Sequence, residues 1–148
     1  MANSVERARH PAHWAAGPRL RMPLLDPASG RTLPSDWSLI VTHGMNALIE
    51  GDDELTQAMV RALKPCLRTP VRSWRRGPLI ESPATLLVAE VGALSVEAQS
   101  ALFEWLSVGA APRRVIATSS RPVFPMVERG QFRADLYYHL NIILLQLR

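Results

Sequence analysis

The sequence predicts an α/β fold with a mainly parallel sheet, and two apolar runs with a helical pattern between them carry this prediction. The stretch Ala84–Gly92 is an apolar run that stops at one carboxylate, Glu90, and it lacks the alternation of polar and apolar residues that marks a half-exposed strand. Arg114–Thr118 is the second run. Such runs are typical of strands buried on both faces of a parallel sheet. Between them, Ser95 is suited to cap a helix, whose apolar face comprises Ala98, Ala101, Leu102, Trp105 and Leu106.

Length and composition place the chain among ordinary globular domains. Its 148 residues, 47% of them apolar, are enough for one domain with a core. The charged fraction of 20% and a mean hydropathy of +0.01 exclude an acidic disordered chain and a membrane protein. No apolar run approaches the roughly 20 residues that span a bilayer, and no signal peptide is visible, so we expect a cytoplasmic protein. A single cysteine, Cys66, excludes an internal disulfide and a cysteine-based metal cage.

The basic balance of the chain comes from arginine. The net charge is +4 and the isoelectric point near 10.2, while Lys64 is the only lysine. A basic chain is compatible with a nucleic-acid partner, but the arginines are spread from Arg7 to Arg148 with one local concentration. Charge alone therefore does not select this function.

Two domain regions are expected. Residues 1–34 carry five prolines and scattered arginines without a helical or strand period, which predicts an irregular, basic N-terminal segment. His10 and His13 lie in it without a third ligand, so we expect no metal site there. Residues 35–148 form the α/β domain.

Trp37–Thr42 is predicted as the first strand, which the chain leaves through His43 and Gly44. Asp52 or Asp53 is then expected to cap a helix whose apolar residues recur at helical spacing until Pro65 stops it. These apolar residues are Leu55, Met59, Ala62 and Leu63.

The short segment Cys66–Arg76 has two interpretations. Four arginines with Trp74 between them could form an anion or nucleic-acid patch with one stacking aromatic. Alternatively, the segment is a solvated connector with Trp74 tucked against the sheet, which we favour.

The last third of the chain predicts three further elements. Pro122 is placed to open a short helix that stops at Gly130. Arg133–Leu140 predicts another helix, and Ile142–Leu147 a closing apolar strand.

Three segments together resemble the AAA+ ATPase domain of bacterial sigma-54-dependent transcription activators. Gly77–Gly92 is similar to the segment that runs into the Walker B strand of that family, and Arg114–Arg121 to the next strand, which carries a polar sensor. Met126–Asn141 is similar to the segment that bears the arginine fingers. The resemblance is strongest over residues 77–147. It implies a three-layer P-loop NTPase-like core, and the chain stops before the helical lid that follows in the family.

The resemblance also implies a phosphate-binding P-loop, which the sequence does not supply. A P-loop needs glycines, whose backbone N–H groups close on phosphate, and a lysine for the β and γ charges. The corresponding region, His43–Asp53, has two glycines in other places and no lysine. One alignment puts Asp53 in the place of the lysine, and the three carboxylates of the region would repel a triphosphate. We therefore expect neither ATP nor Mg²⁺ as a cofactor, although the family uses both.

Five other positions correspond to family site residues. By resemblance, Glu90 keeps the water-orienting carboxylate, while Ala89 stands where the family has the metal-supporting Asp. Ser120 stands at the sensor position, which is normally Asn. Arg133 matches one arginine finger, and His139 replaces the second, where an imidazole cannot supply a permanent bidentate charge. An arginine finger alone is worth about 10³–10⁵ in rate, so these losses together predict no useful turnover.

Three functions remain open at this point. The first is a non-hydrolysing regulatory or interaction module whose partners are activator subunits or further copies of itself. Direct contact with the sigma factor is not expected, because the Gly-Ala-Phe-Thr-Gly-Ala loop that makes it in the family is missing. The second is an ATP-binding subunit that donates Arg133 in trans within a mixed ring. The alternative explanation for Arg133 is a surface salt bridge with Asp135 that only stabilises the fold. The third, a small basic nucleic-acid binder, needs a helix-turn-helix or an aromatic platform, and neither is found.

Overall fold

The computed structural model describes residues 33–68, 70–81, 84–108 and 113–147. Its strands are β1 Ala47–Glu50, β2 Val71–Ser73, β3 Ala84–Val88, β4 Arg113–Ser119 and β5 Ile143–Gln146. Its helices are α3 Leu33–Val41, α4 Asp53–Leu63, η4 Lys64–Cys66, η5 Val91–Ala93, α5 Val96–Ser107, α6 Phe124–Glu128 and α7 Ala134–Leu140.

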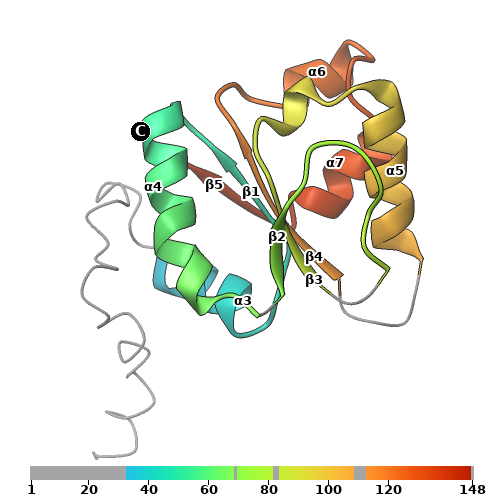
Figure 1. Cartoon of the computed structure of the whole chain (residues 1–148). Helices are drawn as coiled ribbons and strands as arrows, with labels where there is room; N and C mark the ends of the chain where they lie inside the picture. The colour runs from blue at the N-terminus through green and yellow to red at the C-terminus, as the bar shows by residue number, and fades with distance from the viewer. Residues whose placement is uncertain (1–32, 69, 82–83, 109–112, 148) are drawn as a thin grey trace, which may run out of the picture.

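The strands form one sheet in the order β2-β3-β4-β1-β5, and every pairing is parallel. Helices α3 and α4 cover one face of the sheet, and α5 and α7 cover the other (Figure 1). The predicted three-layer fold with a mainly parallel sheet is thus confirmed.

Strand β3 is buried along its whole length, as its sequence predicts. It lies between β2 and β4, with helices over both faces. Leu86 and Val88 join the core under α5 and α7, whereas Leu87 joins the core under α3 and α4. Because neighbouring side chains of a strand point to opposite faces, both cores require apolar residues, and the polar alternation disappears.

The prediction of a strand at Trp37–Thr42 is wrong, because this segment ends helix α3. Trp37 and Ile40 are 3% and 1% exposed and belong to the same core, as residues three apart on one helix face do. The β-branched residues at the end of the segment suggested a strand, but packing overrode that weak preference. Helix α3 also includes residues 33 and 34, which were expected to be irregular. The rest of that segment, with His10 and His13, lies outside the described residues.

The first strand is instead β1, within the region His43–Asp53 that the sequence analysis treated as a loop and helix start. All four of its residues are buried, and it lies between β4 and β5. A strand of four residues is too short to show a period, which explains why the sequence did not identify it.

The predicted helix caps are confirmed. The Asp52 carboxylate accepts a hydrogen bond from the Leu55 N–H at 3.0 Å, and the Ser95 hydroxyl accepts one from the Ala98 N–H at 3.1 Å. Each cap satisfies a backbone donor that has no partner within its helix. The expected elements at the end of the chain are also present as α7 and β5, but α6 begins at Phe124 rather than at Pro122.

The connection between β2 and β3 contains no helix in its described residues, 74–81. Instead, side chains fasten it to the sheet and to α5. The indole N–H of Trp105 donates to the Ile80 carbonyl at 2.6 Å, and that of Trp74 donates to the Gly77 carbonyl at 3.1 Å. Trp74 is only 9% exposed. Trp74 lies against the sheet, as the preferred interpretation of Cys66–Arg76 expected, but the segment is not only a connector, because Val71–Ser73 forms strand β2. A strand of three residues is too short to show a period, so the sequence did not identify it.

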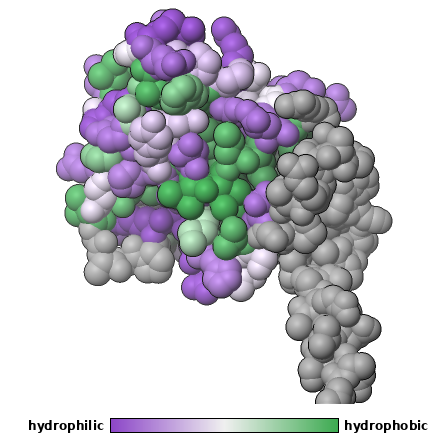
Figure 2. All heavy atoms as spheres, turned by 180° about the vertical axis from the view of Figure 1, so that it is seen from behind, coloured by the Kyte–Doolittle hydropathy of each residue, from purple (hydrophilic) through white to green (hydrophobic). Residues whose placement is uncertain are grey.

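Strand β5 forms one edge of the sheet and carries exposed apolar side chains. Leu144 and the preceding Ile142 are both exposed, while Ile143 and Leu145 point into the core. Figure 2 shows an apolar area surrounded by polar residues on the back of the molecule. Among the described residues, no helix combines the length and the apolar character that crossing a membrane would require.

Candidate functional site

The junction of β1 and α4 is where the fold would hold a phosphate, and here it is closed. Only Gly51 and Asp52 link the strand to the helix. The Gly51 N–H donates to the Ser119 carbonyl at 3.1 Å, and the Asp52 carboxylate occupies the first turn of α4. A carboxylate thus sits at the positive end of the helix, the place that favours anions. Lys64 follows the other end of α4.

This junction does not fit Mg·ATP. It offers no lysine, and its side chains Glu50, Asp52 and Asp53 are carboxylates. Ala89, at the position of the metal-supporting Asp, cannot coordinate a cation. Within the described part of the chain, no group of three or more metal-binding side chains comes together.

Glu50 is a buried carboxylate that the sequence analysis missed as a structural residue. It ends β1 and is 6% exposed. Its Oε2 accepts a hydrogen bond from the Val123 N–H at 2.9 Å, and its Oε1 accepts one from the Gln146 amide at 3.3 Å. Glu50 therefore ties β1 to β5 and to the segment that follows β4. An acidic residue directly after three apolar residues was its only sequence signal.

Glu90 and Ser120 lie together, as their predicted roles require. Both Glu90 carboxylate oxygens accept from Ser120, one from its N–H at 3.0 Å and one from its hydroxyl at 3.1 Å. The Glu90 backbone is left-handed (φ 50°, ψ 58°), a conformation that is uncommon outside glycine. Its N–H also donates to the Thr118 hydroxyl at 3.4 Å. The pair links the ends of β3 and β4.

Arg133 is held by several groups within its own chain. Its guanidinium forms a bidentate ion pair with Asp135, at 2.9 and 2.7 Å, and donates to the Ser100 hydroxyl at 3.0 Å. It also lies over the Phe103 ring, 4.6 Å from the centroid. The hydrogen bonds from Arg133 hold the pKa of the Asp135 carboxyl below its usual range. The structure therefore contains the salt bridge between Arg133 and Asp135 that was the alternative to an arginine finger.

His139 joins the same cluster. Its ring packs edge-on against Phe103 with centroids 5.1 Å apart, and its Nδ1 is 2.9 Å from the Asp135 carbonyl oxygen. The structure thus brings Arg133, the N-cap of α7, and His139 of α7 together against Phe103 of α5. Glu90 and Ser120 form the second cluster, at the carboxyl ends of β3 and β4.

Gln99 was also missed by the sequence analysis. This side chain is buried in α5, its amide N–H donates to the Leu94 carbonyl at 3.1 Å, and its oxygen accepts from the Arg133 N–H at 2.9 Å. It fixes the segment that carries Arg133. A glutamine next to the apolar positions of α5 was a weak signal, because its partners are distant in the sequence.

The patch interpretation of the basic segment finds no support at Trp74. A stacking platform must expose its aromatic face. Trp74 is buried in the core together with Leu86 and Trp105.

Comparison with known proteins gives one family over most of the chain. Residues 56–148 match the family described as the Sigma-54 interaction domain. The chain is 34% identical over 74 residues to the HTH-type transcriptional regulatory protein TyrR of Enterobacter agglomerans, covering 43% of this chain and 14% of that protein. It is 37% identical over 79 residues to the DNA-binding transcriptional activator HyfR of Escherichia coli K12, covering 46% and 12%. The chain therefore spans only a small part of the length of these relatives.

Solved structures agree on the fold. NtrX from Brucella abortus, in a complex with ADP, has a TM-score of 0.64 at 16% identity and covers 99% of this chain and 42% of its own. The R170A mutant of RuvB from Thermotoga maritima has a TM-score of 0.54 at 14% identity, covering 84% and 46%. The family match confirms the resemblance found over residues 77–147 and extends it to Thr56.

We predict that Glu50→Leu destabilises the domain by about 1–3 kcal/mol, because it leaves the Val123 N–H buried without an acceptor. Glu50→Gln keeps an acceptor oxygen of the same reach and should cost less. Urea unfolding of both variants checks the difference. Equal stability of the Leu variant and the wild type would contradict the role of Glu50 as a tie between strands.

We also predict that Arg133→Gln raises the pKa of Asp135 toward its usual range, since the main cause of its lowering is removed. A carboxyl pKa that is lowered on folding stabilises the fold above the usual Asp pKa, and this contribution is lost as the pH falls through the lowered value. The carboxyl ¹³C shift of Asp135, followed by NMR over acidic pH, gives the titration midpoint of this carboxyl in the wild type and in the variant. Arg129→Gln is the matched control, and an unchanged midpoint in Arg133→Gln would contradict the pairing.

Proposed function

Since the chain belongs to the Sigma-54 interaction domain family, we propose that it is a non-hydrolysing member, a regulatory module that works through protein contacts. The family connects it to transcription regulation. The main observation behind this proposal is the closed β1–α4 junction, in which the Asp52 carboxylate caps the first turn of α4. Nucleotide phosphate would meet a like charge there.

The remaining site residues support this proposal, because each is engaged within the chain. Both Glu90 oxygens accept hydrogen bonds from Ser120, and Arg133 is paired with Asp135. An ATPase of this class combines a lysine, an acid pair with Mg²⁺, a sensor and arginine fingers, and an arginine finger alone contributes about 10³–10⁵ in rate. With the lysine, the Asp at Ala89 and one finger replaced, hydrolysis by this chain alone would be negligible.

The surface supports contact with a protein partner. The β5 edge exposes Ile142 and Leu144, and an open edge strand with apolar side chains favours association with another chain. Other activator subunits and further copies of this chain are the candidate partners. The β2–β3 connection is short, which argues against direct contact with a sigma factor.

A second candidate function is the donation of Arg133 in trans to the nucleotide of an intact activator in a mixed ring. The exposure of the Arg133 side chain, 36%, favours it. Such a role would require the guanidinium to leave Asp135, whose exposed ion pair is a small barrier.

We predict that calorimetric titration of the protein with Mg·ATP and Mg·ADP gives no saturable heat up to millimolar nucleotide, and that no phosphate is released. The reason is the carboxylate at the start of α4 and the missing lysine. The ATPase domain of an activator with an intact P-loop serves as the positive control in the same buffer. Binding at micromolar nucleotide would overturn the proposal, and Glu90→Gln would then be the control for hydrolysis.

For the second candidate, the protein is mixed with an intact activator ATPase domain and hydrolysis is followed. We predict that any change of rate is the same for the wild type and for Arg133→Ala, because Asp135, the Ser100 hydroxyl and the Phe103 ring together hold the guanidinium within its own chain. A stimulation that Arg133→Ala abolishes and Arg129→Ala retains would instead support donation in trans.

A further inference from the structure

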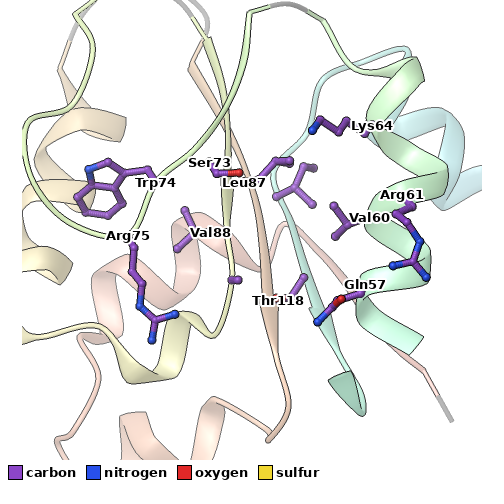
Figure 3. Close-up of a pocket in the computed structure, with 12 residues that line it drawn as sticks. Gln57, Val60, Arg61, Lys64, Ser73, Trp74, Arg75, Leu87, Val88 and Thr118 are labelled. Carbon is purple, nitrogen blue, oxygen red and sulfur yellow. The ribbon is translucent and has the colours of Figure 1, made fainter. Parts of the chain in front are cut away.

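We propose that a groove between α4 and the β2–β3 side of the sheet is a binding site for a small organic anion with an apolar body. The groove encloses about 480 Å³, within the roughly 300–1,000 Å³ of small-molecule sites. Figure 3 shows α4 on one side of it and the segment from Ser73 to Arg75 on the other. The proposal does not depend on whether the chain hydrolyses nucleotide.

The floor of the groove is apolar. The apolar residues that line it from α4, β3 and β4 and from the position after β3 are Val60, Leu87, Ala89 and Ile116, while Val88 borders the groove with its side chain in the core under α5 and α7. Leu87 and Ile116 belong to the core under α4, so this floor is a rigid part of the sheet. Such a surface gains free energy when an apolar group displaces its water.

The rim of the groove is positively charged. Arg61 and Lys64 come from α4, and Arg75 lies across from them (Figure 3). No ion pair or side-chain hydrogen bond engages these three groups within the described residues, and no carboxylate lines the groove. Apart from these three cations, the polar residues that line the groove are uncharged, among them Gln57 and Thr118.

These two features together define the ligand class. An inorganic anion would leave the apolar floor uncovered, and a neutral hydrophobic molecule would leave the three cations without partners. A compact molecule with an apolar ring or branched body and a carboxylate or sulfonate uses both. The groove lies beside the body of α4, from Gln57 to Lys64, and is therefore separate from the closed junction at Asp52.

The test uses 2-naphthoate as the probe and the full chain with its Val, Leu and Ile methyl groups labelled for NMR. We expect saturable shifts of the methyl groups of Val60, Leu87 and Ile116. The uncharged analogue 2-naphthalenemethanol should bind more weakly by about tenfold, as expected for the loss of a charged contact. Equal binding of the two compounds, or no saturable shift at these methyl groups, would overturn the proposal.

Substitutions of the arginines test which positive charges bind the carboxylate of the probe. Arg61→Gln combined with Arg75→Gln should weaken naphthoate binding by at least about tenfold. Arg72→Gln is the matched control, because Arg72 adjoins Ser73 on β2 but does not line the groove. All three side chains are exposed, so these changes leave the core intact. An equal loss in Arg72→Gln would show a general effect of net charge and overturn the groove assignment.

Discussion

The two-residue junction between β1 and α4 constrains the rest of the structure. β1 lies between β4 and β5 in the sheet, so the contacts at its end influence what the carboxyl edge of the sheet can bind. Here Gly51 is tied to Ser119 and the Glu50 carboxylate to Val123 and Gln146. These contacts bring β1, β4 and β5 together at one edge. A buried carboxylate with partners stabilises this edge, and one without them would cost it stability.

The packing of α5 on α7 is a second local constraint. It positions Arg133 and His139, the two residues that correspond to arginine fingers by resemblance. Phe103 of α5 contacts both Arg133 and His139, and Gln99 holds the backbone at Arg133. The arginine is therefore oriented by neighbours within its chain. The same contacts that build the domain thus occupy the groups that the family resemblance associates with chemistry, and this supports the proposal of a regulatory rather than a hydrolytic role.

The described part of the connection between β2 and β3, residues 74–81, holds no helix, and this has a structural consequence of its own. Parallel strands are usually joined by a helix that covers one face of the sheet. Here Trp74, Trp105 and Arg113 fasten an irregular segment in its place. The segment leaves Arg75 facing α4 across an apolar floor, so the shortened connection itself creates the groove.

The sequence by itself determined the strands β3, β4 and β5, most helices, the caps at Asp52 and Ser95, and the family, because these depend on local pattern and on motifs that keep their spacing. It did not determine α3, β1 or β2, since the short segment at Trp37 has strand-forming residues and the two strands are too short for a period. It also predicted the charge conflict at Asp52 but not the role of Glu50 or Gln99. Only the tertiary structure decided these, because their partners are between 30 and 100 positions away, and a lone polar residue in a sequence does not reveal which distant backbone group it will meet.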